Sequence, residues 1–104
     1  MKVVGQVTVN TGANSRIDLG DDSYKYRFRV AGVHADGTKA GFRGKLSTTD
    51  PDNAAATDEV LCAAGREVVR PTREDATTRY LQVLGLSDGT IITASRLNPG
   101  EEVC

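Results

Sequence analysis

Five cationic side chains stand in two short stretches with a spacing of two residues. They are Lys25, Arg27 and Arg29 in the first stretch and Arg43 and Lys45 in the second. In a β-strand, residues two apart point to the same face, so each stretch would present its cations side by side. Lysine and arginine bind phosphates through charge-assisted hydrogen bonds. The spacing therefore predicts a surface for an anionic partner, with nucleic acid as the leading candidate.

The residues between these cations predict the strands that would carry them. Four apolar residues alternate with the first three cations: Tyr24, Tyr26, Phe28 and Val30. The alternation favours a strand over 24–33 with one apolar and one basic face. The turn signal Asp36-Gly37 then favours a hairpin with a returning strand over 38–48. A register that puts Phe42 and Leu46 on the apolar face collects all five cations on the opposite face.

Catalytic motifs do not stand out in this sequence. His34 is the single histidine, it falls at an expected turn, and no second ligand stands at a metal-like spacing from it. No Gly-x-Ser-x-Gly nucleophile motif occurs. Adjacent carboxylates such as Asp21-Asp22 are typical of solvated loops rather than of acid–base pairs across a cleft. We expect no enzymatic activity, no metal site and no cofactor.

The two cysteines leave several alternatives open. Cys62 falls in a predicted helix and Cys104 is the last residue. They could be two unrelated reduced thiols, or a disulfide could hold the C-terminus. The terminal thiol could also form intermolecular bonds under oxidising conditions. The spacing alone does not choose among these states.

Length and composition indicate a single β-rich domain over residues 1–104. The chain is 38% hydrophobic and 26% charged, with a net charge of −1. It has no apolar run long enough to cross a membrane, and no apolar leader follows Met1. We therefore expect a cytoplasmic protein, or a virion protein if it is a viral structural protein. Charge is unevenly distributed, with six cations and one acid from Lys25 to Lys45 and four acids without a cation from Asp50 to Glu59.

Turn signals divide the remaining chain into further strands and one helix. Hairpins are predicted over 2–19 and 79–97, with a short strand at 68–69. Asp50 is a suitable N-cap, Pro51 suits the first helical position and Gly65 suits the stop, which predicts a helix over 51–64. The predicted fold is α+β and β-rich. It is a mainly antiparallel sheet or small barrel of about six strands built from hairpins, with this helix packed across it.

Three functions are compatible with these features. The first is a non-enzymatic binding or assembly module whose basic hairpin, residues 25–45, contacts an anionic partner. The second is a structural subunit of a viral particle or another homo-oligomer, in which the uneven charge mediates self-contact. The third is a small enzyme or an enzyme's accessory subunit. Salt-sensitive binding to nucleic acid would favour the first function, and mass that rises with concentration would favour the second.

Overall fold

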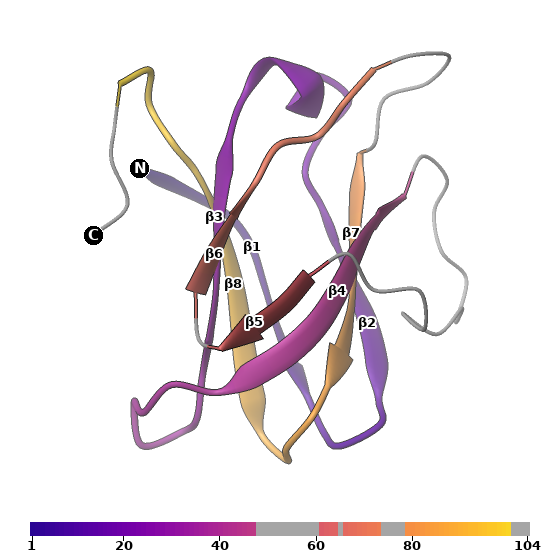
Figure 1. The fold of residues 1–104 in the computed structure, drawn as a ribbon, viewed down its shortest axis with the longest axis vertical. Coiled ribbons are helices and arrows are strands. Elements are labelled where there is room, and N and C mark those ends of the chain that lie inside the picture. Colours follow the sequence, from indigo (N-terminus) through magenta and orange to yellow (C-terminus); the bar gives the residue numbers. More distant parts are fainter. Residues whose placement is uncertain (48–60, 65, 74–78, 101–104) are drawn as a thin grey trace.

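A computed structural model describes residues 1–47, 61–64, 66–73 and 79–100 (Figure 1). These residues form eight strands and one 3₁₀ turn. The elements are β1 (Lys2–Val9), β2 (Asn14–Asp18), η1 (Ser23–Lys25), β3 (Phe28–Val33), β4 (Gly41–Ser47), β5 (Leu61–Ala64), β6 (Arg66–Val69), β7 (Tyr80–Gly85) and β8 (Thr90–Arg96). The β-rich prediction is thus confirmed, although the described strands number eight rather than about six.

The strands form two four-stranded antiparallel sheets that face each other. The strand order is β1-β8-β3-β6 in the first sheet and β2-β7-β4-β5 in the second. The first strand therefore pairs with the last, β2 with β7, β3 with β6, and β4 with β5. This nested pairing is the connectivity of an eight-stranded jelly roll. The described strands form a sandwich with two separate sheets rather than a closed barrel.

The core lies between the sheets and is built from every second residue of their strands. Its most deeply buried apolar side chains are Phe28, Val30, Ile92 and Ala94 from the first sheet and Phe42, Leu81 and Val83 from the second. Burial along β3 alternates as the sequence predicts, with Phe28 buried and Arg29 half-buried. Leu46 is only half-buried against the core, and Arg27 and Lys45 are half-buried rather than exposed.

The three predicted hairpins are wrong as strand pairings, although an isolated antiparallel bridge joins Val33 to Lys39 beside the predicted Asp36-Gly37 turn. β3 lies between β8 and β6, whereas β4 lies between β7 and β5 in the other sheet. The same holds for β1 with β2 and for β7 with β8. Each intervening loop crosses from one sheet to the other, because two half-apolar sheets bury their apolar faces by packing against each other. In the strand predicted over 24–33, residues 23–25 form η1 and pairing begins at Phe28.

Gly32 permits the crossing between β3 and β4. A Cβ atom at this position would lie 2.5 Å from the Ala40 carbonyl oxygen and 2.8 Å from Cδ1 of Phe42. The Gly32 carbonyl also accepts a hydrogen bond from the Ala40 N–H at 3.0 Å. The end of the β3–β4 loop therefore packs directly on β3, and any side chain at position 32 would displace it.

The predicted helix over 51–64 is wrong where it can be checked. Residues 61–64 form β5 and pair with Gly41–Gly44 of β4. Pairing along the open edge of β4 outweighs the helix propensity of this segment, since tertiary contacts routinely override local preference. The predicted start at Asp50-Pro51 lies outside the described residues. Among the residues that are described, none belongs to a helix long and apolar enough to span a membrane.

Candidate anion-binding site

The five cations predicted to share one face occupy three different places. Lys25 belongs to η1 and Arg27 precedes β3, both at one end of the sandwich. Arg29 lies on the outer face of the first sheet, because its neighbour Phe28 points into the core. Arg43 and Lys45 lie on the outer face of the second sheet. The single five-cation face is therefore not formed, since β3 and β4 belong to sheets whose outer faces point in opposite directions.

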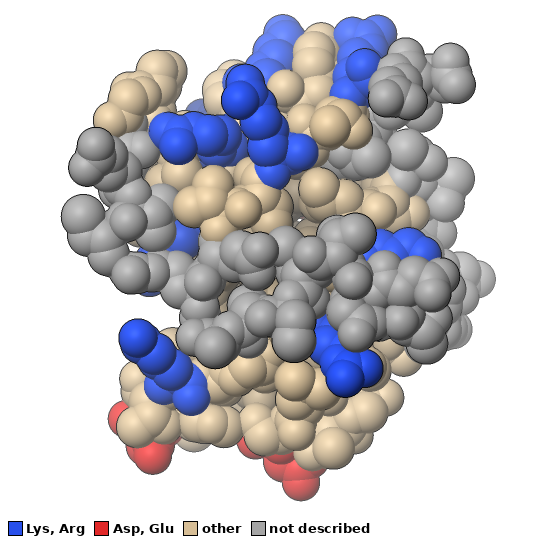
Figure 2. All heavy atoms as spheres, in the orientation of Figure 1, with Lys and Arg blue, Asp and Glu red and all other residues tan. Residues whose placement is uncertain are grey.

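A different group of cations gathers where Lys25 and Arg27 lie. We call this group the basic end: Lys25, Arg27, Arg70, Arg73 and Arg96, together with the rings of Tyr24 and Tyr26. Arg96 ends β8, and Arg70 and Arg73 follow β6. The pairing of β3 with both β6 and β8 brings these three arginines to the segment before β3. Figure 2 shows several cationic side chains over the upper part of the molecule, others lower on the same face, and acidic ones along its lower edge.

Two tyrosine rings hold cations of the basic end in place. The Arg96 guanidinium lies 4.5 Å from the centroid of Tyr26. The Arg73 guanidinium lies 4.8 Å from the centroid of Tyr24 and donates a 2.9 Å hydrogen bond to its hydroxyl. Stacking uses the flat face of a guanidinium and leaves its in-plane N–H groups able to bind oxyanions. Unlike a carboxylate partner, a ring fixes the position of the cation without cancelling its charge.

The Tyr26 ring, which we call the platform because Arg96 lies over it, packs against Phe28 of the hydrophobic core. The ring meets that of Phe28 edge-on, with centroids 6.5 Å apart and planes at 82°. Phe28 is fully buried, so Tyr26 connects a rigid core residue to Arg96. The Leu97 N–H donates a 3.0 Å hydrogen bond to the Arg27 carbonyl, which fixes the segment after β8 beside the segment before β3.

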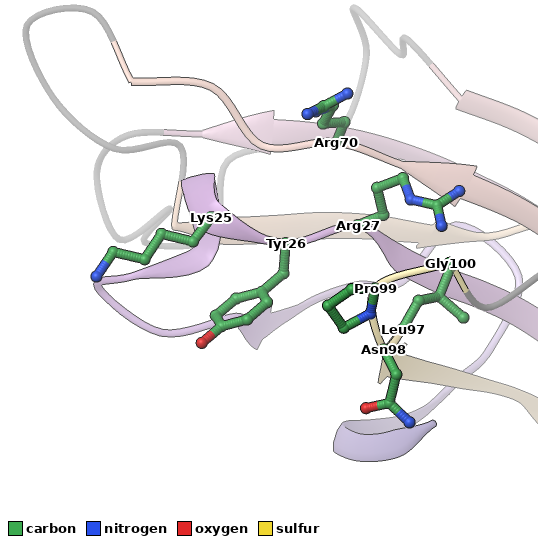
Figure 3. A pocket seen from close by; sticks show the side chains of 8 residues that line it. All are labelled: Lys25, Tyr26, Arg27, Arg70, Leu97, Asn98, Pro99 and Gly100. Carbon is green, nitrogen blue, oxygen red and sulfur yellow. The ribbon is translucent and has the colours of Figure 1, made fainter.

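A small hollow lies between these two segments (Figure 3). Its volume is about 170 Å³, and it is lined by Lys25, Tyr26, Arg27, Arg70 and the residues 97–100. Arg27 reaches toward residues 97–100, whereas the charged ends of Lys25 and Arg70 extend away from the hollow. Pockets for whole small molecules measure about 300–1,000 Å³. This hollow is therefore smaller than a site for a whole small molecule, and its volume admits a group of about phosphate size.

The described acidic residues near the basic end are fewer than its cations. Asp21 and Asp22 precede η1. Asp18 instead receives two 2.7 Å hydrogen bonds from Arg79, to its Oδ1 and Oδ2 atoms. These bonds from Arg79 lower the pKa of the Asp18 carboxyl below its ordinary 3.8. The pair neutralises Asp18 and Arg79 mutually and leaves the five cations of the basic end outside it.

This ion pair makes a testable contribution to acid stability. Because the Asp18 pKa is lowered in the folded chain, the unfolded chain takes up more protons as pH falls below about 4, and stability is lost there. Asp18→Asn should cost at most about 1 kcal/mol at pH 7, since both partners are exposed. The difference from the parent in urea unfolding should shrink as pH falls below about 4, because protonation of Asp18 removes its charge. A difference that stays constant with pH would contradict a charge-dependent role.

Other candidate chemistry lies away from this end. His34 begins the β3–β4 loop, where its backbone N–H donates a 2.8 Å hydrogen bond to the Thr38 carbonyl. Across the described ranges, no group of three or more histidine, cysteine or acidic residues is placed to hold a metal ion. Cys62 belongs to β5 rather than to a helix, and Cys104 lies outside the described residues.

Comparison with known proteins adds no relative to this description. No protein-family model, no curated protein and no solved structure matches the chain.

Proposed function

We propose that this domain is a non-enzymatic module that binds an anionic polymer through the basic end, with single-stranded nucleic acid as the leading candidate. The observation that carries the proposal is the pair of tyrosine–arginine stacks beside a phosphate-sized hollow. The stacks hold cations with their charge intact, and the hollow admits one unit of a chain rather than a whole free ligand.

A single strand fits these features better than a duplex does. The hollow is bordered by Tyr26 and by residues 97–100, and a flexible phosphate backbone could place one phosphate in it. Bases splayed from a single strand stack on aromatic rings and on arginine guanidinium planes, and the basic end has both kinds of group, with Arg73 over Tyr24 and Arg96 over Tyr26. Because the contacts would be mainly to phosphate, we expect little sequence preference.

Salt titration tests this function directly. A fluorescent oligonucleotide about ten nucleotides long would be bound at salt concentrations from about 25 to about 250 mM. Three to five engaged cations should give a log–log slope of roughly −2 to −3.5, because each phosphate contact on a single strand contributes about −0.7. Polyglutamate of similar charge is the matched competitor. Absence of binding at the lowest salt concentration would overturn the proposal.

A structural subunit is the second candidate function. The nested pairing of β1 with β8, β2 with β7, β3 with β6 and β4 with β5 supports it. Jelly rolls with this connectivity occur in viral capsid proteins, and also in lectin domains. This support is an analogy at the level of the fold, and folds host many functions. A virion protein of this kind would have to self-associate, which requires a surface suited to a second copy.

A further inference from the structure

The two sheets end in four edge strands, and β1 differs from the other three. It has eight residues, whereas β2 has five and β5 and β6 have four each. In the described part of the chain, β1 pairs with β8 alone. The edge strand β2 carries Arg16 and Asp18, and β6 carries Arg66 and Glu67. Charges and short length are the usual devices that keep edges from pairing with other chains.

The sequence of β1 lacks most of this protection. From Val3 to Val9 it contains no charged residue and no proline. Val3 is 60% exposed, and Gln6 and Thr8 are exposed as well. An irregularity between Val3 and Gly5 interrupts the ladder, so the regular part of the edge is Gly5–Val9. An uncharged edge of this kind is a template for another strand.

The charges at the two ends of β1 identify the partner. Lys2 begins the strand opposite Arg96, so this end is positive. Just beyond Val9, the Asp88 carboxylate accepts a 2.9 Å hydrogen bond from the Thr11 N–H, so this end is negative. A second copy arranged antiparallel places Lys2 of each chain beside the 10–13 loop and Asp88 of the other. A parallel copy would instead bring like charges together.

We propose that two copies of this chain form a symmetric dimer by antiparallel pairing of their β1 strands, which joins the two β1-β8-β3-β6 sheets into one. A two-fold axis at Val7 pairs Gly5–Val9 with its copy and makes the contact self-complementary. Gln6 of each chain then lies opposite Thr8 of the other, on the outer face of the joined sheet. None of the five cations of the basic end belongs to the paired segment Gly5–Val9, and Arg96 lies opposite Lys2 beyond its end.

Sedimentation equilibrium under reducing conditions tests the dimer. Reductant, with Cys104→Ser in parallel, removes any contribution from the terminal thiol. For the parent, we expect the mean mass to rise from 11.1 kDa toward twice that value as concentration is raised to about 1 mM. The double variant Gln6→Lys/Thr8→Lys places like charges opposite each other twice. It should need at least about a tenfold higher concentration to dimerise.

Two further variants test the edge and its register. The control Ala35→Lys/Val68→Lys adds the same charge at exposed positions away from β1 and should dimerise like the parent. The variant Gln6→Lys/Thr8→Glu places opposite charges across the proposed axis and should restore dimerisation, with greater salt sensitivity.

Hydrogen exchange of the parent gives a measurement that does not depend on variants. Amides of Gly5–Val9 should exchange more slowly as the dimer forms. A parent that stays monomeric at about 1 mM overturns the proposal. A dimer that survives Gln6→Lys/Thr8→Lys, or one whose β1 amides are unchanged by concentration, overturns it too.

Discussion

Reversing the three exposed cations of the basic end, Lys25, Arg70 and Arg73, to glutamate is expected to weaken binding to a short single-stranded oligonucleotide by about a hundredfold at about 50 mM salt. Each exposed cation–phosphate contact is worth up to about 1 kcal/mol, and a loss of about 3 kcal/mol corresponds to two decades in affinity. The log–log slope with salt should also become shallower by about 2, because three contacts of about 0.7 each are removed. Fluorescence anisotropy at several salt concentrations measures both effects.

A matched triple variant separates this site from the charge of the whole molecule. Lys39→Glu/Arg43→Glu/Lys45→Glu changes the net charge equally but lies in the β3–β4 loop and on the outer face of the second sheet. We expect this variant to lose affinity only a few-fold and to keep most of its salt slope. Equal losses in the two variants would indicate diffuse attraction rather than a site. A larger loss in this second variant would instead assign binding to Arg43 and Lys45. Circular dichroism should confirm that both variants fold.

Strand β3 shows what a local sequence pattern can and cannot predict. Alternation along β3 correctly predicts that Phe28 and Val30 point into a core and that Arg29 does not. Alternation does not indicate which sheet a strand joins, however, because each sheet of a sandwich has one apolar face. Neighbouring strands in sequence usually pair, and the hairpin predictions followed that tendency. Here β4 and β5 are the one described pair of consecutive strands that does so.

Local sequence pattern also predicts only part of the candidate site. The spacing of Lys25 and Arg27 predicts a site at these two residues, and both border the hollow. Arg70, Arg73 and Arg96 carry no local signal, because they reach the site only through the pairing of β3 with β6 and β8. Nor does spacing reveal that Tyr24 and Tyr26 stack with arginines distant in the sequence. A site assembled at the end of a sandwich depends on topology.

Replacing Phe28 with alanine is expected to destabilise the fold by about 3–5 kcal/mol, the usual cost of truncating a buried aromatic residue. Phe28 is fully buried and belongs to the core cluster that both sheets share. The change also removes its edge-on contact with Tyr26, and such ring pairs add about 0.5–1.5 kcal/mol. Since domains of this size are typically stable by about 5–15 kcal/mol, the midpoint of urea unfolding should fall steeply.

The neighbouring residue Arg29 supplies the control for the stability loss expected of Phe28→Ala. Arg29→Ala changes an outward-facing, half-buried side chain and should alter stability by far less. Equal losses at the two positions would contradict the inward orientation of Phe28.

Because the Tyr26 ring contacts Phe28 and Arg96 lies over that ring, Phe28→Leu should weaken oligonucleotide binding by loosening the position of Tyr26, while most of the apolar volume stays filled. If Phe28→Leu is less stable but binds as tightly as the parent, the core does not position Arg96 for binding.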